Sequence, residues 1–135
     1  MDDLILKKIV KFITPCIQLF GIYVIMYGHI TPGGGFSGGT IIAASLILQH
    51  ITFGKNNVHF IFRKEMALKL IGFSLILYST IKGYSFFGSQ FHLPHPPIGV
   101  PGNLFSGGFI LPLNILIGVT VSSTFYVIFT LFSNE

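Results

Sequence analysis

The chain has 135 residues, of which 51% are hydrophobic and only 9% are charged, and its mean hydropathy is +0.77. A soluble domain carries roughly 25% charged residues, so this chain has too few charges to cover a globule in water. Its net charge of +4 rests on eight basic and four acidic residues, without the basic face that nucleic-acid binding requires. The composition therefore excludes a soluble or nucleic-acid-binding domain and predicts one integral membrane domain over residues 1–135.

Four apolar segments follow one another along the chain, each close to the roughly 20 residues that a helix needs to cross a bilayer. We expect helices because a segment in lipid must satisfy its own backbone hydrogen bonds. The segments do not show the apolar–polar alternation of a membrane β-barrel. The sequence thus predicts an all-α membrane protein whose four transmembrane helices span residues 9–28, 36–53, 67–87 and 111–132.

A glycine-rich stretch, "GHITPGGGFSGGT" at residues 28–40, connects the first two predicted spans. It does not fit a phosphate-binding loop, which follows a strand and usually carries a lysine. Pro32 and the three glycines after it instead predict a tight hairpin, and Gly38 and Gly39 predict a helix that packs very closely on its neighbours. His29 stands at the end of the first span, where it would either cap the helix or take up a proton near neutral pH.

The basic residues of the flanks and connections predict the orientation in the membrane. Residues 29–35 and 88–110, which form two of the connections, contain neither lysine nor arginine. The positive-inside rule therefore places both termini and the middle connection in the cytoplasm of a cell (inner) membrane. The basic residues on that side are Lys7, Lys8, Lys11, Lys55, Arg63 and Lys64.

Small and polar residues recur at helical spacing on one face of each later span. Such a face lets the backbone of another helix approach closely. We therefore expect these faces to pack against other helices, both within this chain and in partner subunits. They are Gly35, Gly39 and Ala43 in the second span, Ser74, Tyr78 and Lys82 in the third, and Asn114, Gly118 and Ser122 in the fourth.

Charged residues inside the spans are scarce. Pumps usually move protons and cations past buried carboxylates, so we do not expect an autonomous transporter or exporter. Lys82 is the one formal charge well inside a predicted span, about five residues, or ~7.5 Å of helix rise, from its outer end. It would either snorkel to the interface or line a hydrated pathway with Tyr78 on the same face. The acidic residues all lie at predicted membrane edges or in the middle connection: Asp2, Asp3, Glu65 and Glu135.

The histidines and the single cysteine do not predict a metal site or a disulfide. His92 and His95 share a proline-rich connection, but two ligands without a third do not make a metal site. His50 and His59 flank the cytoplasmic side, and we assign neither a role. Cys16 is alone, which excludes an internal disulfide. We expect no metal, no other cofactor and no catalytic chemistry in this chain.

The stretches "GHITPGGGFSGG" and "GNLFSGGFILPLNILIGV", together with the length and the four spans, resemble the MnhB/MrpB family. Its members are small subunits of the Mrp-type multi-subunit monovalent cation/proton antiporters, which are related to the proton-pumping arm of respiratory complex I. Related subunits occur in energy-converting membrane-bound hydrogenases. In the antiporter branch the last helix region carries an acidic residue, whereas Asn114 is the nearest polar group here, and residues 97–121 look closer to the hydrogenase-associated branch. The first motif is carried by His29, Pro32, Gly33, Gly34, Gly35, Phe36, Gly38 and Gly39.

The resemblance implies a non-catalytic membrane subunit of an Mrp-type cation (Na+)/proton antiporter module in a large complex, either free-standing or in the hydrogenase-associated branch. The alternative is a purely structural assembly subunit of an energy-converting membrane-bound hydrogenase or of a complex I-like respiratory complex. Both hypotheses imply other membrane subunits and the lipid bilayer as partners. The first hypothesis has a candidate ion pathway of His29, Tyr78, Lys82 and Asn114.

Overall fold

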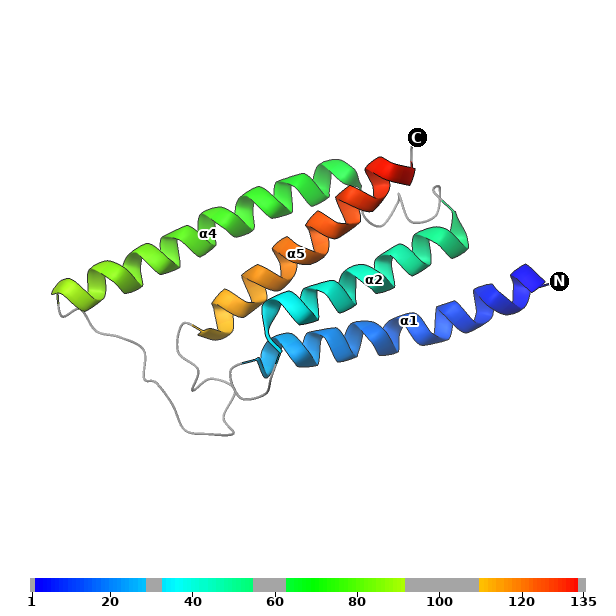
Figure 1. The fold of residues 1–135 in the computed structure, drawn as a ribbon, viewed down its shortest axis with the longest axis horizontal. Helices are drawn as coiled ribbons and strands as arrows, with labels where there is room; N and C mark the ends of the chain where they lie inside the picture. The colour runs from blue at the N-terminus through cyan, green and yellow to red at the C-terminus, as the bar shows by residue number, and fades with distance from the viewer. Residues whose placement is uncertain (1, 29–32, 55–62, 92–109, 134–135) are drawn as a thin grey trace.

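The computed structural model describes residues 2–28, 33–54, 63–91 and 110–133. Within these ranges the chain is all-helical and contains no strand, which confirms the fold class that the sequence predicts. Each of the four helices is long and apolar enough to cross a membrane. The helices are α1 (Asp2–Met26), α2 (Gly35–Phe53), α4 (Lys64–Phe91) and α5 (Ile110–Ser133) (Figure 1).

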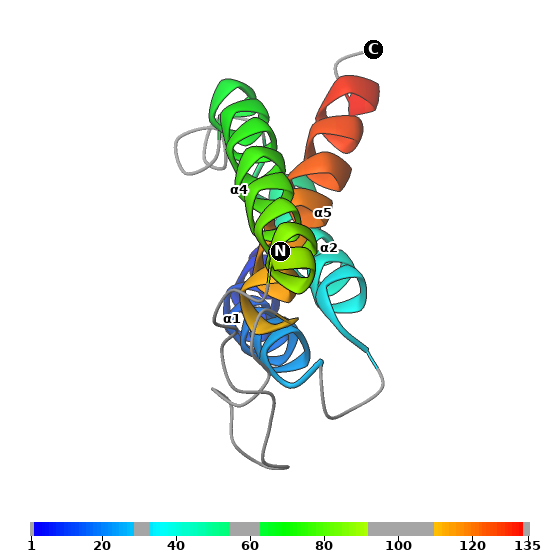
Figure 2. The ribbon, with the colours of Figure 1, turned by 90° about the vertical axis from the view of Figure 1, so that its left-hand side faces the viewer.

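The helices stand side by side in the order α4, α5, α2, α1 (Figure 1). α5 packs against α4 on one side and against α2 on the other. In the view turned by 90°, α4 and α5 occupy the upper part, α1 lies below them, and α2 lies to one side (Figure 2). α1 begins and α5 ends at the same end of the group of helices (Figure 1). We call that end the termini side, and the opposite end, where α1 ends and α2 begins, the hairpin side.

Two helices extend beyond the apolar segments that the sequence predicts as spans. α1 begins at Asp2, because residues ahead of the apolar segment, such as Leu4 and Lys7, also favour a helix. α4 begins at Lys64 and continues to Phe91, because no proline interrupts the sequence before residue 94. On the hairpin side α4 therefore extends past the beginning of α5 (Figure 1).

Many large apolar side chains of this chain point outward. Phe12 and Leu19 on α1 are 77% and 67% exposed, and Phe73 and Ile76 on α4 are 62% and 68% exposed. Apolar surface on this scale is covered by lipid or by other proteins. The buried apolar side chains lie where neighbouring helices meet: Val10, Ile25, Ala43, Ala67, Leu113, Tyr126 and Val127.

Candidate functional site

Glycines bring α1, α2 and α5 into backbone contact. Gly38 of α2 faces α1, because a Cβ at its position would lie 2.7 Å from the carbonyl oxygen of Gly21 and would collide with Ile25. Gly21 faces back, since a Cβ there would lie 3.1 Å from the carbonyl oxygen of Gly38. Contacts this close leave no room for a side chain, so the approach depends on glycine. We call the residues of this contact the glycine junction: Gly21, Gly35, Gly38, Gly39 and Gly118.

The same stretch of α2 also packs against α5. A Cβ at Gly35 would lie 2.5 Å from the carbonyl oxygen of Asn114, and one at Gly39 would lie 2.8 Å from the carbonyl oxygen of Gly118. Successive helix residues point about 100° apart, so Gly38 and Gly39 face two different neighbours. The consecutive glycines of the motif therefore let one helix approach two others.

The α2 face predicted for helix packing continues towards the termini side. Ala43 is buried, with 2% of its surface exposed, and lies one turn beyond Gly39 on the same face. Gly118 also touches α1, because a Cβ there would lie 2.6 Å from the Cδ1 atom of Ile25. Gly35, Gly39, Ala43 and Gly118 are thus all buried among these three helices.

Asn114 closes the hairpin side of the glycine junction. A Cβ at Gly28 would lie 2.9 Å from the Nδ2 atom of Asn114 and 2.5 Å from the Cα atom of Gly34. Gly33 and Gly34 have φ angles of +149° and +119°, in the region that side-chain-bearing residues rarely adopt. The chain therefore brings Gly28 and Gly34 into contact at the reversal, and the Asn114 side chain packs beside them.

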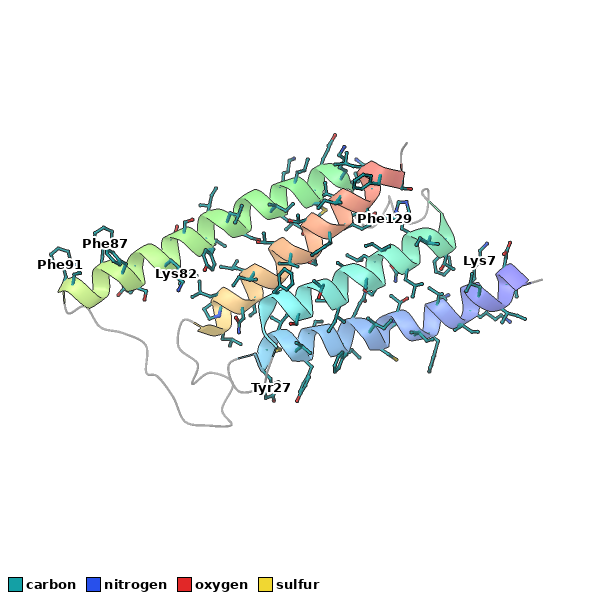
Figure 3. The ribbon with its side chains drawn as sticks, in the orientation of Figure 1. Lys7, Tyr27, Lys82, Phe87, Phe91 and Phe129 are labelled. Carbon is teal, nitrogen blue, oxygen red and sulfur yellow. The ribbon has the colours of Figure 1, made fainter. Side chains whose placement is uncertain are left out.

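The polar face of α4 runs along α5 and ends at Lys82. Ser74 is buried, Tyr78 is half-buried, and Lys82, one turn further on, is exposed near the beginning of α5 (Figure 3). Tyr78 contributes to a groove of about 110 Å³ between α4 and α5. The groove is lined by Leu75, Tyr78, Ile117, Thr120 and Val121.

The candidate ion-pathway residues do not all meet at one place among the described residues. Asn114 packs against the glycines of α1 and α2, whereas Tyr78 and Lys82 belong to α4 on the other side of α5. His29 and Pro32 lie outside the described residues. The hairpin and the α4 face are therefore two separate features.

His50 lies in a buried contact that the sequence analysis missed. Only 5% of its surface is exposed, and its Nδ1 atom lies 3.4 Å from the hydroxyl of Tyr126 on α5. Its ring also meets the ring of Phe129 edge-on, with 5.3 Å between centroids. Spacing could have revealed this contact, because His50 follows Ala43 by seven residues and so continues the α2 face that packs on α5.

Buried hydroxyl groups hydrogen-bond within their own helices. Thr14, Ser45 and Thr130 are each at most 1% exposed. They donate to the carbonyl oxygens of Val10 at 2.7 Å, Ile42 at 2.7 Å and Tyr126 at 2.8 Å, respectively. Because an internal partner satisfies each hydroxyl, these residues can be buried without water.

Ionisable groups of the described helices lie mostly at the termini side. The acidic side chains that the structure describes are Asp3, in the first turn of α1, and Glu65, in the first turn of α4. Within the described ranges, no three side chains of His, Cys, Asp or Glu come together as a metal site would require. The interior of the described spans therefore offers hydroxyl, amide and imidazole groups, but no carboxylate.

A second and larger groove lies beside the glycine junction. Its volume is about 320 Å³, and α1, α2 and α5 all contribute to it. Ser122 is a polar residue of this lining, and its hydroxyl donates to the carbonyl oxygen of Val119 at 3.1 Å. The remaining lining is Ile22, Ile25, Met26, Ile42, Ile115, Gly118 and Val119.

The chain is similar to proteins named for antiporters. Residues 5–127 match the family described as a domain related to the MnhB subunit of the Na+/H+ antiporter. A protein of Staphylococcus epidermidis that carries the name of an antiporter subunit, mnhB2, is 36% identical to this chain over 90 residues. These residues cover 67% of this chain and 64% of that protein. Its namesake in Staphylococcus saprophyticus is 30% identical over the same shares.

An archaeal relative shows the same similarity. An uncharacterised protein of Methanocaldococcus jannaschii is 37% identical over 107 residues, which cover 75% of this chain and 41% of that protein. The matches thus span about two fifths to two thirds of the relatives' own lengths. Because the family match covers nearly the whole chain, from residue 5 to residue 127, this protein belongs to the MnhB family.

Proposed function

We propose that this chain is a non-catalytic membrane subunit of an Mrp-type cation/proton antiporter module, within a complex of several membrane subunits. The observation that carries this proposal is the MnhB match over residues 5–127, whose family description names a Na+/H+ antiporter. The names of the staphylococcal relatives support it. The activity and partners of those longer proteins are extended to this chain as part of the proposal.

The shape of the chain supports a role within a complex. Its helices form a row, and the outer faces of α1 and α4 carry exposed Phe and Leu side chains. The interior of the described spans holds no carboxylate of the kind that cation pathways use. An ion crossing the membrane here would therefore need acidic groups from neighbouring subunits.

The same proposal includes the location of the chain. We infer a cell (inner) membrane with both termini in the cytoplasm, because most lysine residues of the described helices lie at the termini side. The hairpin side would then face outward. Lys7 on α1 marks the basic end, opposite Tyr27 at the hairpin (Figure 3).

A role of this chain in the exchange itself rests on its few ionisable groups near the hairpin side. His29 and Lys82 are the residues that we propose to take part. Lys82→Met removes the charge and keeps much of the bulk, and His29→Asn removes the titrating group and keeps hydrogen bonding. We expect at least one variant to assemble normally and to shift the pH dependence of exchange.

A purely structural role is the second candidate, and specific packing favours it. The Asn114 side chain packs against Gly28 and Gly34. Asn114 is the polar residue nearest to the position where the antiporter branch carries an acidic residue. The buried hydroxyls hydrogen-bond within their helices. The host of such a subunit would be a membrane-bound hydrogenase or a complex I-like respiratory complex.

One experiment separates these functions. The tagged chain is purified from its native membrane in mild detergent, and the subunits that co-purify are identified. Everted vesicles of a deletion strain, with and without the chain restored, are then tested for cation-driven proton release, with complex content checked by blotting. Antiporter subunits and restored exchange are the expected result. Hydrogenase subunits without restored exchange, or normal exchange by His29→Asn and Lys82→Met at every pH, would leave the structural role.

A further inference from the structure

Among the residues that the structure describes, no acidic side chain lies within reach of Lys82. It lies 17 residues after Glu65 on the same helix, which is about 25 Å of helix rise. Asp3 lies in the first turn of α1, at the termini side. The sequence contains no Asp or Glu between residues 66 and 134. We therefore look for a carboxylate partner of Lys82 in another chain.

Apolar surface flanks Lys82 along both directions of α4. Towards the termini side, Leu75 lies two turns before Lys82 on the same face and is 49% exposed. Towards the end of α4, Phe86 lies one turn after Lys82 on that face and is 63% exposed. Such a surface is buried in lipid or protein rather than left in water. Whatever covers it also removes water from around Lys82.

Helix geometry opposes escape of the ammonium group to water. Lys82 lies six residues before Gly88, where the candidate membrane span of α4 ends, which is about 9 Å of helix rise. A lysine side chain reaches only about 6 Å from its Cα atom. In addition, the Cα–Cβ bonds of a helix tilt towards its N-terminus, so Lys82 starts out pointing away from the nearer end of α4.

We propose that Lys82 forms an ion pair with a carboxylate on a transmembrane helix of a neighbouring subunit, which packs along the Tyr78–Lys82 face of α4. A charge in an apolar environment is stabilised by an opposite charge in contact with it. The groove of about 110 Å³ beside Tyr78 gives that helix a place to seat a side chain. This inference names a partner within the proposed complex and so rests on the proposed function.

Zero-length cross-linking in the native complex tests the pair. Dicyclohexylcarbodiimide enters membranes and joins an amine and a carboxylate in contact through an amide bond. We expect a covalent product of this chain with another subunit, with the linkage mapped to Lys82 by mass spectrometry. Lys82→Arg keeps the charge but cannot form the amide, so the product should be lost while the complex still assembles. Lys69→Arg, a matched change at an exposed lysine on the same helix, should leave the product unchanged.

Charge reversal gives a second measurement. Lys82→Glu would place like charges together and should reduce the recovered complex, and the reverse change at the mapped carboxylate should restore it. A product that persists in Lys82→Arg would overturn the proposal. The proposal would also be overturned if the wild type gave no cross-linked product and the Lys82→Met complex were recovered in the wild-type amount. That result is expected for a lysine whose ammonium group reaches the lipid headgroups. A mapped Lys82 linkage in a complex without exchange activity would instead refute only the proposed function.

Discussion

Gly39 of α2 rests directly on Gly118 of α5: a Cβ at Gly39 would lie 2.8 Å from the Gly118 carbonyl oxygen and 3.1 Å from its Cα atom. This contact sets how closely α2 and α5 approach. Because Gly118 also touches Ile25 of α1, it helps to set the position of a third helix. Changes at this point should therefore affect the whole row.

Replacing Gly39 with leucine should destabilise the fold. The new side chain would collide with the α5 backbone, and overpacking of this kind costs about 1–3 kcal/mol. The measurement is the melting temperature of the purified protein in detergent, with recovery of its complex on native gels. Gly72→Leu is the matched control, because nothing lies within 4 Å of a Cβ at Gly72. Equal behaviour of the two variants would mean that Gly39 faces lipid.

The hairpin should be sensitive to a single methyl group at Gly34. Its φ of +119° and ψ of −164° fall in a region that is essentially restricted to glycine, and forcing alanine into it costs about 1–3 kcal/mol. Gly34→Ala should therefore lower the melting temperature. Gly83→Ala, where a Cβ meets open space in an ordinary helix, should not lower it. An unchanged melting temperature of Gly34→Ala would contradict the backbone conformation described for Gly34 at the hairpin.

Tyr126 should contribute mainly through its ring. The side chain is fully buried, and truncating a buried aromatic residue to alanine costs about 3–5 kcal/mol. Tyr126→Phe keeps the ring and removes the hydroxyl, which lies 3.4 Å from His50, and a single hydrogen bond contributes about 0.5–1.5 kcal/mol. Chemical unfolding in detergent should rank the alanine variant well below the phenylalanine variant. Tyr23→Ala, at a half-exposed position, is the control for loss of a tyrosine.

Cysteine labelling should show which side of the membrane the connections occupy. Cys16 is the single cysteine of the chain, so Cys16→Ser provides a background without thiols. In that background a membrane-impermeant maleimide should label Ser89→Cys or Gln90→Cys from outside intact cells, and should not label Asn56→Cys. The reason is the concentration of basic residues on the side of residue 56. Labelling of Asn56→Cys from outside would show that the chain has the opposite orientation in the membrane.

The sequence by itself determined the four helices and their membrane character. Runs of apolar residues long enough to cross a bilayer must be helical in lipid, so composition and length alone decide the fold class. The positions of Pro32 and the glycines after it likewise predict a reversal between the first two spans. Helix ends were less certain, since α4 continues to Phe91 where the apolar run suggests residue 87. The helix continues past the apolar run because no proline interrupts the chain between residues 87 and 94.

Only the tertiary structure decided which helix each small residue meets. A periodic face of small residues predicts that a helix packs against another helix. It does not identify that helix, because every small-residue face permits the same close approach. The row of helices assigns Gly38 to α1 and Gly39 to α5, and it turns His50 from a flanking residue into a buried partner of Tyr126. It also leaves Lys82 on the exposed edge of the α4–α5 contact, because α4 packs mainly against α5 and presents its other faces outward.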